Sequence, residues 1–396
     1  MIAVYLAPVY ILVNIYVVRW ILRWAGACFS LFQSRAFCII FSGLYLLWAS
    51  SLLTGFLVKK PLGLHRFLKR AGDQFLGFFI YISICILTLD FFRLLMRNVF
   101  HAKWTQESYV FICVGSFCGL LICILTVYGI LHTLSIRTNP YDISIEKSAG
   151  ENSSLKLVLL ADLHLGCSAG VRHTERIIDQ INRENPDIVC IAGDFFDNRY
   201  EDLENPEKLQ ELFRSIHSSY GVYACLGNHD LNEPILAGFT FRNNTTAIMD
   251  DPRMKDFLKN SGIQLLEDET VLVDNRFYLT GRKDPSRCKK LSDTRLSPAE
   301  LTSELDLSKP VFFLDHQPSE LQECADAGVD LCLGGHTHDG QFFPGNLFMK
   351  FLWENPCGCI KKDRMYSIVT SGCGVWGPDM RIGTDNEICP ITIRFT

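Results

Sequence analysis

The fold of this chain is decided by one stretch, Asp187-Ile188-Val189-Cys190-Ile191-Ala192-Gly193-Asp194-Phe195-Phe196-Asp197. The run from Ile188 to Ala192 is short, apolar and rich in β-branched residues, so it predicts a buried strand. Asp194 then stands at the carboxyl end of that strand, where open α/β sheets place their ligands. Gly193 lets the backbone turn tightly and leaves space beside a ligand. An isolated Gly-Asp pair is more often a turn cap, so the functional interpretation of Asp194 depends on the rest of the chain.

Four other predicted strands end in polar side chains of the same kind. These strands cover about residues 155–161, 222–226, 311–314 and 330–333, and helices are predicted over 172–184, 206–215, 297–305 and 319–327. The strand ends read Asp162-Leu163-His164, Gly227-Asn228-His229-Asp230, His316, and Gly334-Gly335-His336-Thr337-His338. Residues two apart on an extended segment point to the same side, so an Asp-x-His or His-x-His pair can hold one ion. Carboxylate and imidazole ligands together suit Mn, Fe or Zn rather than Ca.

Chance does not explain this series of strand ends. Turn capping or a charged surface would have to place seven side chains with metal-binding groups at consecutive strand ends by accident. The sequence therefore predicts a metal site, with these candidate ligands: Asp162, His164, Asp194, Asn228, His316, His336 and His338. His229 is a candidate acid or phosphate-side donor, and Asp230 is the residue expected to fix its tautomer.

The order of these motifs resembles that of the calcineurin-like metallophosphoesterase family. The resemblance runs from about residue 155 to the C-terminus, and all five family motifs are present without a departure. It implies an α/β (αββα) sandwich of two mixed β-sheets between helices, with two divalent metal ions at the strand ends. It further implies one metal held by Asp162, His164, Asp194 and His338, and a second by Asp194, Asn228, His316 and His336. In the same way, it implies that His229 is catalytic and that Asp230 orients it.

A later segment has a looser resemblance to a membrane-associated branch of this family. It is carried by Gly340-Gln341, Pro344, Gly372, Trp376-Gly377-Pro378-Asp379-Met380-Arg381-Ile382-Gly383 and Glu387-Ile388. This branch includes transmembrane metallophosphoesterases and enzymes similar to the lipid A pathway hydrolase that acts on UDP-diacylglucosamine. Arg381 is either a substrate-binding residue that meets phosphate or a structural residue, and both interpretations stay open.

The first third of the chain has a different composition. It contains four long apolar stretches, at about residues 2–18, 36–58, 75–95 and 109–131, each close to the roughly 20 residues that cross a bilayer. They have almost none of the polar residues that a soluble bundle needs. We expect a membrane domain of about four transmembrane helices over residues 1–135, a polar linker over 136–154 and a metallophosphoesterase domain over 155–396. Asp90, an acid within the third stretch, is expected to pair with Arg93 rather than to act in function.

Charge and cysteine content bear on location and partners. The basic segment from Lys59 to Arg70 predicts a cytoplasmic loop by the positive-inside rule, and with four spans the metal domain is then cytoplasmic too. Basic residues in the other loops oppose this orientation. The 16 cysteines form no spaced framework, which favours a reducing compartment. The net charge of −5 indicates no overall excess of basic residues, so nucleic acid is not an expected partner.

The sequence thus predicts a membrane-anchored, dinuclear-metal phosphohydrolase that cleaves phosphoester or phosphodiester bonds. Its expected partners are the lipid bilayer and a phosphorylated small-molecule or lipid substrate. The alternative is a membrane signalling or transport protein whose phosphoesterase-like domain binds metal without turnover. The complete ligand set and His229 argue against that alternative.

Overall fold

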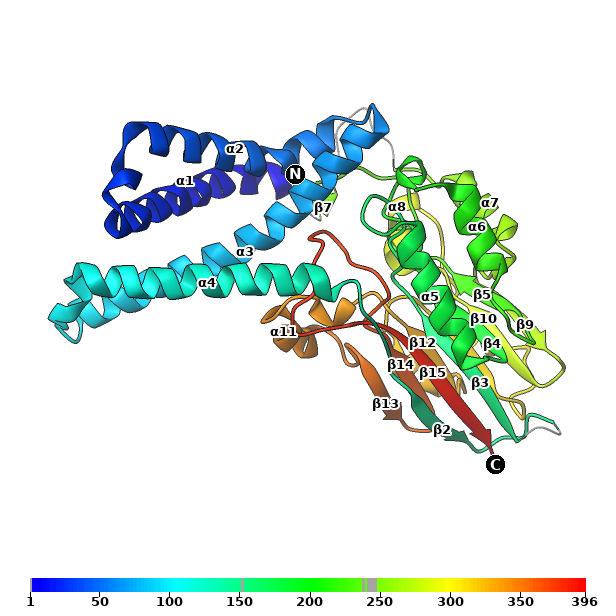
Figure 1. Ribbon diagram of the computed structural model, residues 1–396. Coiled ribbons are helices and arrows are strands. Elements are labelled where there is room, and N and C mark those ends of the chain that lie inside the picture. The colour runs from blue at the N-terminus through cyan, green and yellow to red at the C-terminus, as the bar shows by residue number, and fades with distance from the viewer. Residues whose placement is uncertain (1, 151–152, 237–238, 241–247) are drawn as a thin grey trace. The chain divides into compact units, whose positions relative to one another are not determined.

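The computed structural model describes residues 2–150, 153–236, 239–240 and 248–396, which divide into two compact units (Figure 1). The helical unit comprises Met1–Leu131, Ile235–Asn243 and Gly377–Met380. Its second segment carries a short antiparallel pair, β6 (Ile235–Leu236) and β7 (Phe239–Thr240). The α/β unit comprises His132–Pro234, Asn244–Trp376 and Arg381–Thr396.

Four long helices dominate the described part of the helical unit. They are α1 (Ile2–Cys28), α2 (Arg35–Leu57), α3 (Leu62–Asn98) and α4 (Ser108–His132), with 3-10 turns η1 (Ser30–Gln33) and η2 (Lys103–Gln106) between them. Each is long and apolar enough to cross a membrane, as the sequence predicts. α3 begins well before residue 75, so Lys69 lies on a helix rather than in a loop and pairs with Asp73 at 2.8 Å.

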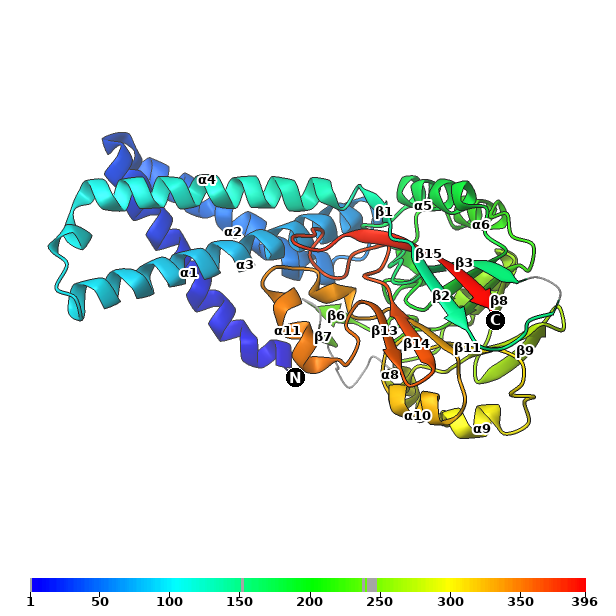
Figure 2. The ribbon, with the colours of Figure 1, turned by 90° about the horizontal axis from the view of Figure 1, so that it is seen from below.

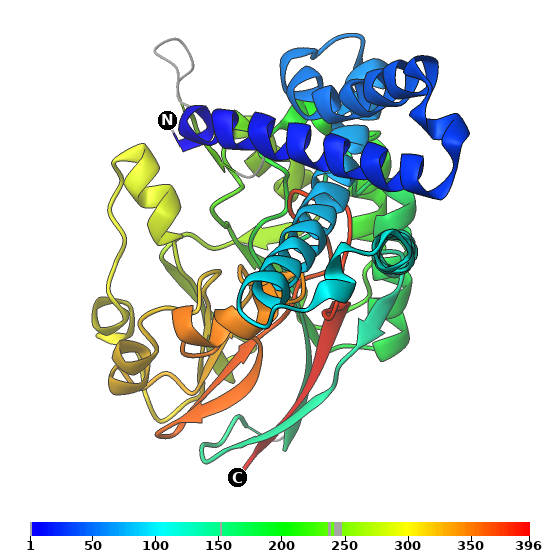
Figure 3. The same cartoon turned by 90° about the vertical axis from the view of Figure 1, so that its left-hand side faces the viewer.

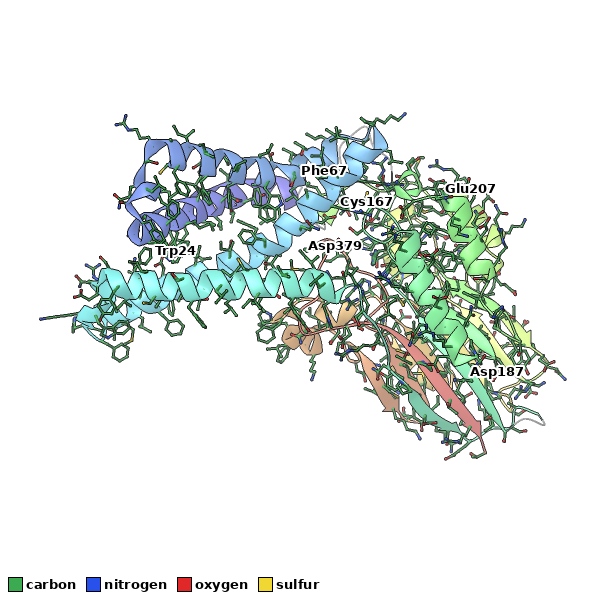
Figure 4. The ribbon with its side chains drawn as sticks, viewed as in Figure 1. Trp24, Phe67, Cys167, Asp187, Glu207 and Asp379 are labelled. Atoms are coloured by element: carbon green, nitrogen blue, oxygen red, sulfur yellow. The ribbon has the colours of Figure 1, made fainter. Side chains whose placement is uncertain are left out.

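Close contacts join the four helices. Trp24 on α1, labelled in Figure 4, donates from Nε1 to the carbonyl of Ile112 on α4 at 3.4 Å. The backbones of α2 and α3 approach so closely that a Cβ at Gly72 would lie 2.8 Å from the Cα of Leu52. On α3, Asp90 pairs with Arg93 at 3.4 Å, which confirms the expected ion pair.

Two mixed β-sheets form the described core of the α/β unit. The first sheet has seven strands. Six of them lie in the order β1 (Ile136–Thr138), β15 (Asn386–Phe395), β3 (Ser154–Leu160), β4 (Ile188–Ala192), β5 (Val222–Cys225) and β8 (Ile263–Leu265). The seventh, β2 (Tyr141–Ile145), also pairs with β15. The second has six, in the order β13 (Gly358–Lys362), β14 (Met365–Val369), β12 (Leu331–Gly334), β11 (Val311–Leu314), β10 (Phe277–Gly281) and β9 (Glu269–Val273).

The segment 136–154, expected to be a linker, instead contributes strands β1 and β2 to the first sheet. Figure 3 shows β2 in teal beside β15 in red, and the register pairs Ile143 with Ile393. Ile143 and Ile145 are buried, whereas the residues between and before them face solvent. This alternation makes an edge strand look polar in composition, which is why the sequence suggests a linker here.

Helices cover both outer faces of the paired sheets. On the first sheet lie α5 (Val171–Glu184, alongside β3 and β4 in Figure 1), α6 (Pro206–Arg214) and α7 (Pro252–Asn260). On the second lie α9 (Pro298–Thr302) and α10 (Leu321–Asp326), close together in Figure 2. Two further helices, α8 (Pro285–Leu291) and α11 (Gly345–Leu352), follow β10 and β12. The unit is therefore the predicted αββα sandwich.

Apolar side chains between the two sheets hold the sandwich together. Leu157 and Leu159 of β3 belong to one buried cluster with Leu279 of β10 and Phe312 of β11. Strands β3, β4 and β5 run parallel to one another, and so do β10, β11 and β12. The carboxyl ends of each parallel set therefore lie at one edge, where the polar residues that follow the strands come close together.

Candidate metal centre

The seven predicted ligands come together at the carboxyl ends of the parallel strands. Asp162 and His164 follow β3, Asp194 follows β4, Asn228 follows β5, His316 follows β11, and His336 and His338 follow β12. Two groups have all their ligand atoms within 4.8 Å of one another: Asp162 with His164 and His338, and Asp194 with His316 and His336. Each group draws its residues from both sheets, so the site exists only once the sandwich has formed.

The first group brings two imidazole rings together through their Nε2 atoms. The Nε2 atoms of His164 and His338 lie 3.0 Å apart, and His338 Nε2 lies 3.7 Å from Asp162 Oδ1. All three side chains are buried. Two ring nitrogens directed at each other at this distance need a proton or a cation between them, because two lone pairs repel.

Asp194 faces both groups. Its Oδ2 atom lies 3.1 Å from His316 Nε2 in the second group and 3.9 Å from His164 Nε2 in the first. The amide oxygen of Asn228 lies 3.2 Å from the same nitrogen of His316. The other ring nitrogen of His316 donates to the carbonyl of Ala192 at 2.7 Å, which fixes the ring relative to β4. One carboxylate oxygen is thus available to both groups at once.

The backbone around these ligands is unusual. Positive φ angles, which non-glycine residues rarely adopt, occur at five of the seven: Asp162, His164, Asp194, His336 and His338. Such conformations cost about 1–3 kcal/mol each and concentrate at functional sites. Glycines also leave room for the ligands: a Cβ at Gly193 would lie 2.7 Å from His316 Nδ1, and one at Gly335 would lie 2.7 Å from Asp162 Oδ2.

Burial shifts the pKa values of several of these groups. It lowers the pKa of His164 to about 4 and that of His336 to about 3, so both rings are neutral at pH 7 with a lone pair to offer. Burial raises the pKa of Asp162 to about 7, because a buried negative charge is costly without a partner. A nearby cation would restore the charged carboxylate.

Asp194 and His316 are the exception to this effect of burial. Burial opposes the charge on each, but their mutual attraction outweighs it. The contact holds the pKa of Asp194 well below its usual value and that of His316 well above. A divalent ion bound to Asp194 would supply positive charge in place of the proton on His316, and His316 would then offer a neutral ring nitrogen. Buried carboxylates, neutral imidazoles and an amide oxygen are a donor set that fits divalent metal ions.

The environment of His229 differs from the expectation. His229 Nδ1 lies 2.6 Å from Oδ1 of Asn198, a residue that the sequence analysis missed. Asp230, expected as the orienting partner, instead accepts backbone N–H groups of Gly227 at 2.7 Å and of Asp194 and Phe196 at 3.0 Å. Its carboxylate therefore holds the loops together. No sequence pattern marks Asn198, since it stands in a loop with a φ of 65° and not at a strand end.

Arg381 has the contacts of a structural residue. Its side chain is fully buried, and Nη2 donates to the carbonyls of Ser371 at 2.5 Å and Gly374 at 2.8 Å. The same nitrogen lies 3.3 Å from Nδ1 of His338. These contacts favour the structural interpretation of Arg381 over phosphate binding, because its donors face the protein.

Two tryptophans flank the centre: Trp376, which belongs to the segment that resembles the membrane-associated branch, and Trp353, which the sequence analysis did not single out. The ring of Trp353 meets that of His336 edge to face, with centroids 5.2 Å apart. The rings of Trp376 and His229 also meet edge to face, with centroids 6.3 Å apart. The backbone N–H of Trp376 donates to Gln341 Oε1 at 2.8 Å, and its C=O accepts from Gln341 Nε2 at 2.9 Å. Both tryptophans are only half-buried, so each presents an apolar surface beside the centre.

Comparison with known proteins agrees with this geometry. Residues 155–340 match the family model described as calcineurin-like phosphoesterase. An uncharacterized metallophosphoesterase of Aquifex aeolicus (strain VF5) is 28% identical over 278 residues, covering 68% of this chain and 97% of that protein.

Two other relatives carry more specific names. A transmembrane protein with metallophosphoesterase domain of Danio rerio is 26% identical over 327 residues, covering 80% of this chain and 70% of that protein. The UDP-2,3-diacylglucosamine pyrophosphatase LpxG of Chlamydia trachomatis serovar D (strain ATCC VR-885 / DSM 19411 / UW-3/Cx) is 22% identical over 238 residues, covering 52% of this chain and 70% of that protein. Both names agree with the membrane-associated resemblance in the sequence.

Proposed function

We propose that this chain, whose residues 155–340 are a calcineurin-like phosphoesterase domain, is a membrane-anchored phosphohydrolase that works with two divalent metal ions. The observation that carries the proposal is the position of Asp194, which faces two groups of candidate ligands at once. Family membership and four apolar helices support the same assignment. Signalling or transport without turnover remains the rival, and the experiment below separates the two.

The ligand set suggests how the ions would be held. Asp162, His164, Asp194 and His338 would hold one, and Asp194, Asn228, His316 and His336 the other. Imidazole and carboxylate donors favour Mn, Fe or Zn. When bound, the two ions supply neutralisation of phosphoryl charge and activation of a water nucleophile.

His229 is the proposed catalytic residue. Asn198 faces its Nδ1 atom, which leaves Nε2 as the atom to meet a substrate. From there an imidazolium would stabilise the charge that develops on a phosphoryl group or protonate the leaving oxygen. The backbone N–H of His229 also donates to Asp194 Oδ1 at 2.8 Å, so the histidine and the carboxylate keep a fixed spacing.

A lipid-linked phosphoester is the proposed substrate class. The four apolar helices keep the domain at a membrane, and one relative is named for a diacylated sugar nucleotide. The half-buried Trp353 and Trp376 add apolar surfaces suited to such a molecule.

We further propose a cytoplasmic catalytic domain, which the 16 cysteines support because all lie in the described residues and none forms a disulfide. An impermeant thiol reagent should then label the exposed Cys359 only after cells are permeabilised.

The activity test uses the full chain in detergent with p-nitrophenyl phosphate and bis-p-nitrophenyl phosphate, metal-stripped and then reloaded with Mn, Fe or Zn. Turnover should require metal and should fall by at least about 100-fold in His229→Ala with metal retained. In Asp194→Asn both metal content and turnover should be lost. Asp142→Asn, the same change at an exposed carboxylate of β2, should match the unsubstituted chain.

Two results would contradict the proposal. One is full turnover by His229→Ala. The other is bound metal without turnover of these esters or of lipid-linked phosphoesters, which would favour the signalling or transport alternative.

A further inference from the structure

Helix α11 is apolar and exposed. None of its eight residues, all of which the structure describes, is buried. Leu347, Phe348, Phe351 and Leu352 are spaced so that they share one helix face, and Phe351 and Leu352 are 85% and 72% exposed. Soluble domains rarely leave such a continuous apolar face in water, so this face calls for a partner.

Both ends of α11 lie next to candidate ligands of the metal centre. At its start, the segment 341–343 runs beside Ile382, whose carbonyl accepts from Phe343 N–H at 2.8 Å. That segment directly follows η4 (His338–Gly340), which carries the ligand His338. At its end, Trp353 packs against the ligand His336. The exposed face is therefore next to the site.

The same edge of the α/β unit is tethered to a candidate membrane span. His132, the last residue of α4, bonds Asp385 at 2.6 Å, and the carbonyl of Thr133 accepts from Asn386 at 2.7 Å. Only residues 133–135 separate α4 from β1, a reach of about 10 Å when extended. Since Ile382 and Asp385 belong to one short segment, the start of α11 lies near His132, the residue at which α4 ends and the α/β unit begins.

We propose that α11 is an interfacial helix whose apolar face enters the lipid surface of the membrane that its own spans cross. Its composition fits this partner. Between Phe342 and Trp353 the sequence has no acid, and its one charge is the exposed Lys350, so apolar chains can enter the acyl region while Lys350 and Trp353 stay at the headgroups. The metal centre would then open at the lipid surface. Only this last consequence rests on the proposed lipid-phosphoester function.

The test is photolabelling of the full chain in nanodiscs of phosphatidylcholine and phosphatidylglycerol with tritiated acyl chains. The photoreactive residue p-benzoylphenylalanine replaces Phe351, or in separate samples Ile39 on α2 or Leu272 on β9, which are 72% and 41% exposed. Position 351 should take up at least about five times the label of position 272, approaching that of position 39. Equal labelling at 351 and 272, with position 39 labelled, would overturn the inference.

A second pair of variants tests the chemistry of the contact. With the probe at 351, Phe348→Glu should lower lipid labelling several-fold because a carboxylate resists entry into the acyl region, whereas Phe348→Leu should preserve it. Metal content of each variant reports that the domain is folded. Unchanged labelling in Phe348→Glu would contradict the proposal. Because labelling needs no turnover, failure of the phosphohydrolase proposal and failure of this one give different results.

Discussion

The Oδ1 atom of Asn198 lies 2.6 Å from the Nδ1 atom of His229. The Asn198 amide is held in this orientation because its Nδ2 donates to Glu233 Oε1 at 3.3 Å and to the Leu231 carbonyl at 3.4 Å. An amide oxygen only accepts, so Nδ1 of His229 carries a hydrogen and Nε2 is left for the proposed contact with substrate. In the proposed mechanism, Asn198 is thus a positioning residue for His229.

We expect Asn198→Ala to lower kcat by about 10–100-fold, the usual effect of removing an orienting partner. Metal content should stay unchanged because Asn198 is not a candidate ligand, and Asn198→Asp should recover part of the activity because it keeps an acceptor. Elemental analysis and kcat with bis-p-nitrophenyl phosphate measure the two quantities. A kcat equal to that of the unsubstituted chain would remove Asn198 from this role.

Asp230 should matter for stability. Its carboxylate accepts three buried backbone N–H groups, so Asp230→Ala leaves them unpaired and should lower the free energy of unfolding by about 3 kcal/mol or more. Asp230→Asn keeps one acceptor oxygen and should cost less. Denaturant unfolding of the full chain in detergent gives the comparison. Equal stability of the alanine variant and the unsubstituted chain would show that these bonds are replaced by water.

Arg381 should support metal retention rather than substrate binding. Arg381→Gln removes donors to the carbonyls of Ser371 and Gly374 and frees the loop beside His338, so the metal Kd should rise by roughly 10-fold. The KM for p-nitrophenyl phosphate in excess metal should change less than about two-fold, since the guanidinium faces the protein. A large rise in KM with unchanged metal affinity would instead support phosphate binding by Arg381.

His173 should make stability depend on pH. Its Nε2 lies 2.7 Å from the carbonyl of Cys373, and burial lowers its pKa below the ordinary 6.5. The folded chain therefore resists protonating His173, while the unfolded chain takes up a proton below about pH 6.5. Stability should fall as the pH drops through this range, by at most about 1.4 kcal/mol per pH unit from this one group.

The variant that isolates this effect is His173→Gln, which keeps a donor near the Cys373 carbonyl but does not titrate. Between pH 7.5 and 5 its melting temperature should fall less than that of the unsubstituted chain. Parallel pH profiles of the two proteins would assign the effect to other groups.

Local patterns explain what could be predicted. The apolar run of β4 between turn formers identifies a buried strand, and the helix stripe of Ile177, Ile178 and Ile181 identifies a covered face. Edge strands β1 and β2 escaped prediction because none of the three residues of β1 is buried and only alternate residues of β2 are. Helix α11 escaped because its apolar residues face outward, where no core pattern marks them.

The sequence by itself determined which side chains stand at the strand ends, since strand length and the polar tip that follows are local properties of the chain. It also determined the four apolar helices, because span length follows from hydropathy. Only the tertiary structure decided which groups meet. The bond between Asn198 and His229 joins residues 31 apart and that between Arg381 and His338 joins residues 43 apart. Such contacts depend on loops with positive φ angles and on the pairing of two sheets, and no single segment of sequence encodes either.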